Sequence, residues 1–384
     1  MNLAEKVKAL PLTPGVYLMK DRLGHIIYVG KAKSLKKRVQ TYFQHSKAHS
    51  PKVKRLISNI RDFEIRLTDT EFEAFMLECR LIKQLKPLYN KKMKNPLAYT
   101  YLVIRNSREG FRRIDITNDP AGQEGDLFFG PYTSRSTVEK AVQGLQESYR
   151  ILCSNPYARH SPCLNHSLGL CLGMCTGSED ALRAYNSVLD KIITSLTGGN
   201  PPVVLQDLEQ RMMEAAEMHN FEAAAKYRDL MKTVGSLIRG EKVIGFAEED
   251  RNIVILEPVN DREAKLILVK GNRIVRDTKV AAPDGDRNGP GAPDKLHTLV
   301  RSAILDTFRP ADPAAPRPKI SRHDIDEAQI LYSFLQGSAR SYLIVPEHWL
   351  IPGHEGELGE AVEELIAGYV RAQNSAGDHD GPDA

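Results

Sequence analysis

Apolar and polar residues alternate near the start of the chain in a way that predicts a β-hairpin followed by helices. Residues 15–19 and 26–29 are short runs of strand-forming residues, and the polar segment 20–24 between them ends in glycine, as is typical of a turn. Helical spacing then appears over residues 34–43, where the first serine is expected to cap the helix, and over residues 71–85. This part of the chain therefore predicts a small antiparallel sheet with helices.

The middle of the chain is predicted to be a short mixed module followed by a helical pair. Apolar or small residues recur at helical spacing over residues 201–238, and the two helices are expected to meet near His219 and Asn220. Upstream of this pair, strand-like runs lie at 99–105, 113–117 and 127–129, and a helix is predicted over 137–150.

The last third of the chain has a mixed pattern. Two segments rich in Pro and Gly, 284–293 and 309–318, are predicted to be loops. Strands are predicted at 243–246, 252–256, 265–269, 273–275 and 341–346, and helices at 327–335 and 355–373. The whole pattern predicts an α+β protein with an N-terminal module at 1–94, a linking module at 95–180, a helical hairpin at 201–238, a small mixed α/β region at 243–373 and a disordered tail at 374–384.

Seven residues of the N-terminal module carry groups that phosphodiester hydrolysis needs. Period-two alternation lets Tyr17 and Tyr28 project from neighbouring strands toward one patch. Arg38 and Tyr42 lie four residues apart, on one face of a helix. Such a set supplies a proton acceptor, cations for the developing phosphate charge and a carboxylate for a metal ion. The candidate catalytic residues are Tyr17, Tyr28, Lys31, Arg38, Tyr42, Glu78 and Asn90, and Glu78 is the candidate metal ligand.

The distribution of charge favours a polyanionic substrate. The formal net charge of the 384 residues is only +4, but residues 1–100 contain 21 Lys or Arg against 8 Asp or Glu. The first hundred residues therefore carry +13 and the remainder −9. Lysines 31, 33, 36 and 37 surround the candidate site, and lysines 91, 92 and 94 follow Asn90, as expected for sequence-independent contacts with DNA phosphates.

Four of the five cysteines lie close together in a pattern typical of a metal site. The sequence shows no signal peptide and no long apolar run, so we expect a cytoplasmic protein, in which clustered thiolates bind metal more often than they form disulfides. The candidate ligands are Cys153, Cys163, Cys171 and Cys175. Four thiolates suit either structural zinc or an iron-sulfur cluster. We interpret His160 and His166 as loop residues and Cys79 as a buried thiol.

The N-terminal module resembles the GIY-YIG endonucleases, and more narrowly the UvrC family, which makes the incisions of bacterial nucleotide excision repair. The resemblance rests on PLTPGVYLMKDRLGHIIYVGKAKSLKKRVQTYF and on TEFEAFMLECRLIKQLKPLYN. It implies that Glu78 holds one Mg²⁺ or Mn²⁺ and that Tyr17 or Tyr28 helps to deprotonate water, with Lys31 lowering the cost of the phenolate. It also implies that Arg38 stabilises the pentacovalent phosphate, that Tyr42 orients it, and that Asn90 braces the site.

The same resemblance extends to the cysteine segment and the helical pair. UvrC proteins carry a four-iron four-sulfur cluster in the corresponding cysteine segment, which favours that cofactor over zinc. The segment 201–238 is similar to the UVR motif, which in UvrC pairs with a helical hairpin of UvrB. The residues expected to be buried or to face the partner are Met213, Phe221, Tyr227 and Leu230. The alternative is a helix pair that packs on its own domain.

Full-length UvrC proteins continue with an RNase H-like nuclease and helix-hairpin-helix motifs that this sequence does not show, so we expect a short form. The resemblance implies a single incision of damaged duplex DNA, 3′ to the lesion, after recruitment by UvrB. The sequence has no Walker A motif, so ATP-driven damage search is expected from UvrA and UvrB. Two alternatives remain: a UvrB-binding accessory protein that does not cut, and a GIY-YIG nuclease of a mobile or defence system.

Overall fold

The computed structural model describes residues 3–44, 50–106, 112–153, 161–198, 201–283, 292–308, 320–337 and 340–377. These residues form two compact units. The first combines residues 1–95 with 246–384, and the second comprises residues 96–245. Among the described residues, no helix has the length and apolar character needed to cross a membrane.

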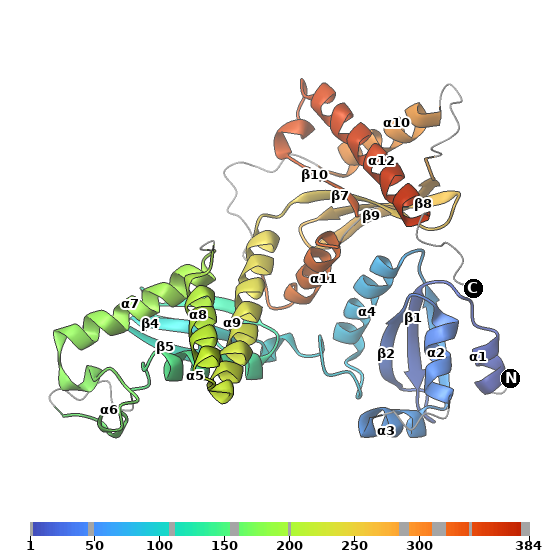
Figure 1. Ribbon diagram of the computed structural model, residues 1–384. Helices are drawn as coiled ribbons and strands as arrows, with labels where there is room; N and C mark the ends of the chain where they lie inside the picture. The colour runs from blue at the N-terminus through green and yellow to red at the C-terminus, as the bar shows by residue number, and fades with distance from the viewer. Residues whose placement is uncertain are drawn as a thin grey trace. The chain divides into compact units, whose positions relative to one another are not determined.

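The N-terminal part of the first unit is a three-stranded antiparallel sheet between helices (Figure 1). Helix α2 and its neighbours pack on one face of this sheet against Tyr17 and Met19, and helix α4 packs on the other face against Val16 and Leu18. This alternation follows from the period-two geometry of β1. The elements are α1 (Leu3–Lys8), β1 (Gly15–Lys20), β2 (Ile26–Ala32), α2 (Leu35–Phe43), α3 (Pro51–Asn59), β3 (Asp62–Leu67) and α4 (Glu71–Leu85), with sheet order β2-β1-β3.

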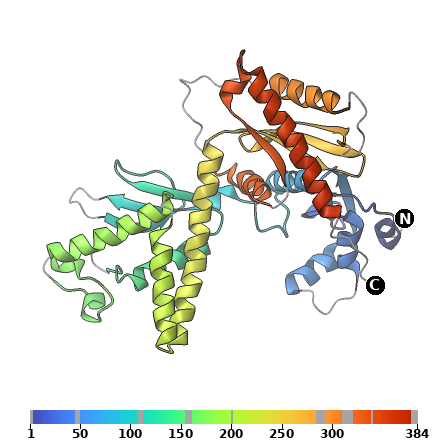
Figure 2. The ribbon, with the colours of Figure 1, turned by 45° about the horizontal axis from the view of Figure 1, so that its top comes forward.

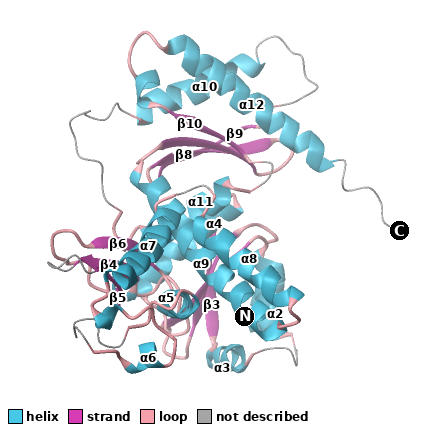
Figure 3. Ribbon diagram, turned by 60° about the vertical axis from the view of Figure 1, so that its left-hand side comes forward, coloured by secondary structure: helices cyan, strands magenta, loops and turns pink. Residues whose placement is uncertain are grey.

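The C-terminal part of the same unit is a four-stranded antiparallel sheet with the order β10-β7-β8-β9. Helices α10 and α12 cover one face, and α11 lies on the opposite face (Figure 3). The central strands are buried on both faces, which explains their continuous apolar runs. The elements are β7 (Asn252–Pro258), β8 (Glu263–Lys270), β9 (Arg273–Ala281), α10 (Ala292–Thr307), α11 (Ile325–Leu335), β10 (Ser341–Val345), η3 (Glu347–Leu350) and α12 (Glu355–Gly377).

Helix α4 joins these two parts of the first unit because it is apolar on two faces. One face packs on the N-terminal sheet through residues such as Ala74 and Leu81. The other face, with Phe72, Met76 and Cys79, packs against α11 and strands β7 and β8. Cys79 is fully buried there, as the sequence predicted.

The second unit contains a three-stranded sheet with the order β5-β4-β6. Helices α5, α7, α8 and α9 share a core with this sheet. Helices α8 and α9 lie side by side (Figure 2). The predicted helix pair is confirmed, and its loop lies at residues 218–220. The elements are η1 (Pro96–Ala98), β4 (Thr100–Asn106), β5 (Arg112–Thr117), β6 (Leu127–Tyr132), α5 (Arg135–Ser148), α6 (Leu164–Ser167), η2 (Met174–Thr176), α7 (Glu179–Leu196), α8 (Val203–Glu217) and α9 (Phe221–Glu248).

Two predictions of local structure were wrong. The predicted strand 243–246 is the last part of helix α9, because Val243, Ile244 and Ala247 continue the buried helical stripe. The predicted tail begins too early, since α12 extends to Gly377, and residues 378–384 lie outside the described residues. The loop predicted at 309–318 and most of the loop predicted at 284–293 also lie outside them, as does His160.

Candidate active site

Three tyrosines meet on the face of the N-terminal sheet that α2 covers. Tyr17 on β1 and Tyr28 on β2 have ring centroids 6.1 Å apart, and the Tyr42 ring on α2 lies 5.8 Å and 6.3 Å from them. The hydroxyls of Tyr17 and Tyr42 are 2.9 Å apart and share a hydrogen bond. A side chain at Gly30 would overlap the Tyr17 hydroxyl, so glycine is needed where the tyrosine crosses the next strand.

Burial and the proximity of neighbouring phenols raise the pKa of Tyr17 and of Tyr28. Burial raises the pKa of Tyr17 well above the usual phenol value, and Tyr42 and Tyr28 raise it further. Burial also raises the pKa of Tyr28. In both cases the guanidinium of Arg38 acts in the opposite direction and lowers the pKa. Arg38 is therefore the cation placed to stabilise a phenolate, a role that the sequence resemblance implied for Lys31.

Glu78 reaches the same region from helix α4. One carboxylate oxygen accepts a hydrogen bond from the backbone N–H of Lys31 at 3.0 Å. Burial raises the pKa of Glu78, while this hydrogen bond and the charges of Lys31 and Arg38 lower it. A largely buried carboxylate beside phenols is the kind of oxygen ligand that a hard divalent cation binds.

Asn90 lines the cavity and also binds the backbone of strand β2 through its side-chain amide. Its side-chain oxygen accepts a hydrogen bond from the N–H of Val29, and its amide nitrogen donates to the Val29 carbonyl, both at 2.9 Å. Val29 lies between Tyr28 and Gly30, so this pair of bonds fixes the position of Tyr28 in the strand. The geometry is that of a brace.

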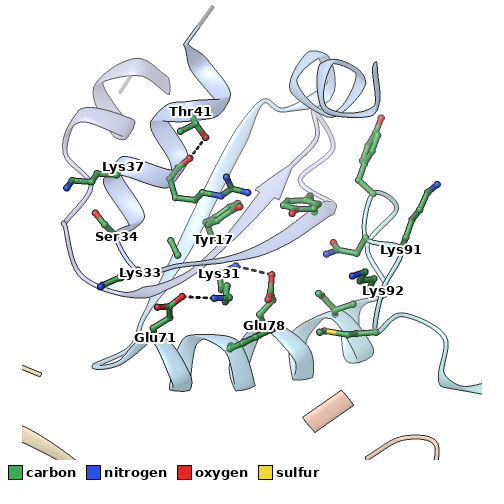
Figure 4. Close-up of a pocket in the computed structure, with 18 of the residues that line it drawn as sticks. Tyr17, Lys31, Lys33, Ser34, Lys37, Thr41, Glu71, Glu78, Lys91 and Lys92 are labelled. Carbon is green, nitrogen blue, oxygen red and sulfur yellow. Dashed lines mark hydrogen bonds and ion pairs between the residues drawn. The ribbon is translucent and has the colours of Figure 1, made fainter. Parts of the chain in front are cut away.

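The Lys31 ammonium is held by helix α4. It forms an ion pair of 2.6 Å with Glu71, and it lies 4.5 Å from the centre of the Phe75 ring (Figure 4). The hydrogen bond from Lys31 lowers the pKa of Glu71. Glu71 and Phe75 were not predicted as site residues, although they lie seven and three positions before Glu78 on the same helix.

A cavity of about 1350 Å³ contains six of the seven predicted site residues in its lining (Figure 4). Tyr42 is not among the lining residues, but it lies beside Tyr17, Tyr28 and Arg38, which are. The cations of the lining are Lys31, Lys33, Lys37, Arg38, Lys52, Lys91 and Lys92, and its carboxylates are Glu71 and Glu78. Lys52 lines the cavity although the sequence did not predict it there. Lys36 and Lys94 were predicted to lie near the site but are not among the lining residues. A cavity with this excess of cations suits a phosphate backbone.

The cap predicted for α2 is only half right. Ser34 is the residue that precedes the helix, but its hydroxyl makes no capping hydrogen bond, and it has no hydrogen-bond partner within the described part of the chain. By contrast, Thr70 and Glu73 form a complete capping box at the start of α4. The helix that carries Glu78 therefore has a firmly fixed first turn.

The second unit brings three of the four predicted cysteine ligands together. The sulfur atoms of Cys153, Cys163 and Cys175 all lie within 4.8 Å of one another. Among the described residues, Cys171 is outside this group; it is buried, and its sulfur accepts a hydrogen bond from the N–H of Gly173 at 3.2 Å. Converging thiols provide the soft ligands that zinc and iron-sulfur clusters bind.

Comparison with protein families matches two segments of the chain. Residues 13–91 match the UvrC-like GIY-YIG domain, and residues 99–195 match the middle domain of UvrC/Cho excinucleases. The first segment contains all seven candidate catalytic residues, and the second contains the four clustered cysteines.

The chain is similar over most of its length to curated proteins called UvrABC system protein C. It is 32% identical to the protein of Acetivibrio thermocellus over 353 residues, which are 90% of this chain and 55% of the relative. It is 37% identical to that of Moorella thermoacetica over 281 residues, which are 72% of this chain and 44% of the relative. The chain thus spans about half the length of the curated relatives it matches.

A solved structure is also similar to part of the chain. It is the GIY-YIG N-terminal endonuclease domain of UvrC from Thermotoga maritima, bound to magnesium as its catalytic divalent cation. It is 37% identical, covers 23% of this chain and 96% of that chain, and has a TM-score of 0.21.

Proposed function

Since this chain belongs to the UvrC family in its GIY-YIG and middle domains, we propose that it is a DNA endonuclease of nucleotide excision repair that makes one metal-dependent incision. The cut would fall on the 3′ side of a lesion. The observation that carries this proposal is the convergence of three tyrosines, Arg38 and Glu78 around a cavity lined by lysines. A protein that only bound DNA would need the lysines but not the buried phenols and carboxylate.

Each part of this site has a chemical role in the proposed reaction. Glu78 would hold one Mg²⁺ or Mn²⁺, which supplies Lewis-acid stabilisation of phosphate charge when bound. Arg38 would donate to the phosphate as negative charge develops on its oxygens, and Tyr42 would orient it by hydrogen bonding. Tyr28, after it has lost its own proton to solvent, would take the proton of the attacking water as the phenolate, because it is only partly buried and lines the cavity, while Arg38 lowers the cost of that phenolate. Asn90 would keep Tyr28 in place through Val29.

Replacement of the metal-binding carboxylate tests the proposal directly. Glu78→Gln should lower nicking of an end-labelled damaged duplex by at least about 10²-fold in Mg²⁺, because a neutral amide of similar size is a much weaker ligand. The assay would be run with and without UvrA, UvrB and ATP, and the gel would show where the nick lies. DNA binding, measured in the absence of metal, should be nearly unchanged.

Glu64→Gln is the matched control, since Glu64 is a carboxylate of the same domain that pairs with Lys20 on β1 and does not line the cavity. It should nick as the unmodified chain does. Wild-type nicking by Glu78→Gln would refute the assignment of Glu78 as the metal ligand. Nicking that occurs on the 5′ side alone would refute the proposed position of the cut.

We further propose that the helical pair α8 and α9 is a UVR hairpin that binds UvrB, with UvrA acting upstream. Support comes from the tip of the pair, where Met213, Met218 and Phe221 are exposed by 52%, 81% and 67%. The base of the pair is different, because Leu208 and Leu230 belong to the core of the second unit. The hairpin would therefore be anchored at its base and offer an apolar tip to a partner.

For the cysteine segment we propose a four-iron four-sulfur cluster, with structural zinc as the alternative. Three converging thiols support a thiolate-bound group, and Cys171 would be the fourth ligand. Protein purified without oxygen should then be brown, absorb broadly in the blue and near ultraviolet, and contain iron and sulfide in equal amounts. Colourless protein with one zinc per chain would favour the alternative.

The fourth ligand can be tested with paired variants. Cys163→Ser and Cys171→Ser should both lower the bound iron to a similar extent if four thiolates hold the cluster, because each removes one ligand. Loss of iron in Cys163→Ser but not in Cys171→Ser would show that Cys171 is not a ligand. Cys79→Ser, in the other unit, is the control that should leave the metal content unchanged.

A further inference from the structure

One residue of strand β2 is held at two points by one helix. The backbone N–H of Lys31 donates to Glu78, and the ammonium of the same lysine pairs with Glu71 at 2.6 Å. Glu71, Phe75 and Glu78 have the spacing i, i+4 and i+7, which places them along one face of α4. The Lys31 side chain therefore runs along this face from Glu78 toward Glu71, with its ammonium over the Phe75 ring.

The two carboxylates compete for the same cation. Among the described residues the Lys31 ammonium forms an ion pair with Glu71 and none with Glu78, whose position on the helix lies about 10.5 Å farther along the axis. Glu71 is available to this ammonium because it stands in the first turn of α4, where the helix dipole favours the ionised form of a carboxylate. The capping box of Thr70 and Glu73 fixes this turn. Without Glu71, the flexible lysine stem would let the ammonium turn to Glu78, the carboxylate beside its own backbone.

We propose that Glu71 is a positioning residue that keeps the Lys31 ammonium away from Glu78, so that the Glu78 carboxylate remains available to a divalent cation. This inference rests on the proposed function, in which Glu78 is the metal ligand. Glu71 does not bind the metal itself in this scheme. It acts through Lys31, and its contribution depends on the presence of that lysine.

Direct titration of the full chain with Mn²⁺, followed by the electron paramagnetic resonance signal of free Mn²⁺, tests the inference without any DNA cleavage. Glu71→Gln should raise the apparent Kd for Mn²⁺ about fivefold, the size expected when a partly exposed ion pair must be broken before the metal binds. Adding Lys31→Met to Glu71→Gln should restore the Kd of the unmodified chain. Glu71→Asp, which keeps the negative charge, should have a Kd for Mn²⁺ close to that of the unmodified chain.

Glu64→Gln is a closely matched control. The Lys20–Glu64 pair has the same length of 2.6 Å, and its side chains are 26% and 40% exposed, against 28% and 44% for Lys31 and Glu71. It should bind Mn²⁺ as the unmodified chain does. An unchanged Kd in Glu71→Gln, or a raised Kd that Lys31→Met does not reverse, would overturn this inference about Glu71. Either result would leave the proposed function standing. If the unmodified chain bound no more Mn²⁺ than Glu78→Gln, the metal site of the proposed function would fall as well.

Discussion

Access to the cavity separates the two tyrosines that could accept a proton. Tyr17 is only 1% exposed, and its hydroxyl is already engaged with that of Tyr42 at 2.9 Å. Tyr28 is partly buried, and its backbone is fixed on one side by the amide of Asn90 bound to Val29. A general base must reach the water from which it removes a proton. The two phenols are therefore expected to differ in role although both are close to Arg38.

Removal of each hydroxyl separately should reveal this difference. Tyr28→Phe is expected to lower the rate of nicking by about 10²-fold or more, the usual contribution of a general base. Tyr17→Phe should lower it by about tenfold, since it loses one hydrogen bond that orients Tyr42. Single-turnover nicking of a damaged duplex by both variants would measure the two effects. Equal losses would show that the phenols act as one unit, and a larger loss for Tyr17→Phe would reverse the assignment.

Six of the seven candidate catalytic residues line the cavity, and they could be predicted from sequence because they stand at fixed distances within short elements. Tyr17 and Tyr28 lie on the two strands of one hairpin, and their approach follows from strand pairing. Glu71 was missed because its role depends on which way the Lys31 side chain turns. That choice is made by the packing of α4 on β2, which spacing alone does not show.

At the scale of elements, helix α9 serves two environments along its 28 residues. Its first residue, Phe221, is exposed, whereas Leu230, Val234 and Leu237 are buried in the core of the second unit. The sequence predicted the helix but ended it too early, because residues 243–246 (VIGF) have strand propensity. Burial of Val243 and Ile244 on the continuing helix overrides that propensity.

Paired substitutions on α9 should separate binding from folding. Phe221→Ala should weaken association with UvrB by about tenfold or more, because it removes a large apolar anchor, and it should leave the melting temperature nearly unchanged. Leu230→Ala should instead destabilise the second unit by about 2 to 4 kcal/mol through the cavity it leaves. Calorimetric titration with UvrB and thermal unfolding measure the two effects. Unchanged binding by Phe221→Ala would indicate that the helix pair serves internal packing only.

At the scale of the whole molecule, the first unit is closed by contacts between segments far apart in the sequence. Lys265 on β8 is 6% exposed and forms ion pairs with two carboxylates. Asp69 lies just before α4, and Glu73 lies in its first turn. Phe72 on α4 stacks on Phe334 of α11, with centroids 4.3 Å apart. Sequence patterns predicted the strands and helices involved, but not that the two ends of the chain share one core. Contacts between residues roughly 200 to 260 positions apart leave no periodic signal in either segment.

Glu257, at the end of β7, should make the stability of this unit depend on pH. Burial raises its pKa to about 6, and the neighbouring carboxylates of Glu73 and Glu71 add to the shift, while Thr70 and Arg340 oppose it. Because the native pKa lies above the unfolded value, the native state binds more protons between about pH 4.5 and pH 6. The free energy of unfolding therefore falls as pH rises through this window. The loss is complete above pH 6 and amounts to about 2 kcal/mol.

Glu257→Gln should remove this dependence, because an amide does not ionise. We expect the variant to unfold at a higher temperature than the unmodified chain at pH 7.5, and to show little difference at pH 4.5, where Glu257 is already protonated. Glu263→Gln is the control: Glu263 begins β8 on the same sheet, and its carboxylate accepts a hydrogen bond from the Asn260 side chain at the surface. Its effect on the melting temperature should be small at both values of pH. If Glu257→Gln raised the melting temperature equally at pH 4.5 and pH 7.5, the cost of burying a charge could not explain the change. Packing of the amide would then account for it.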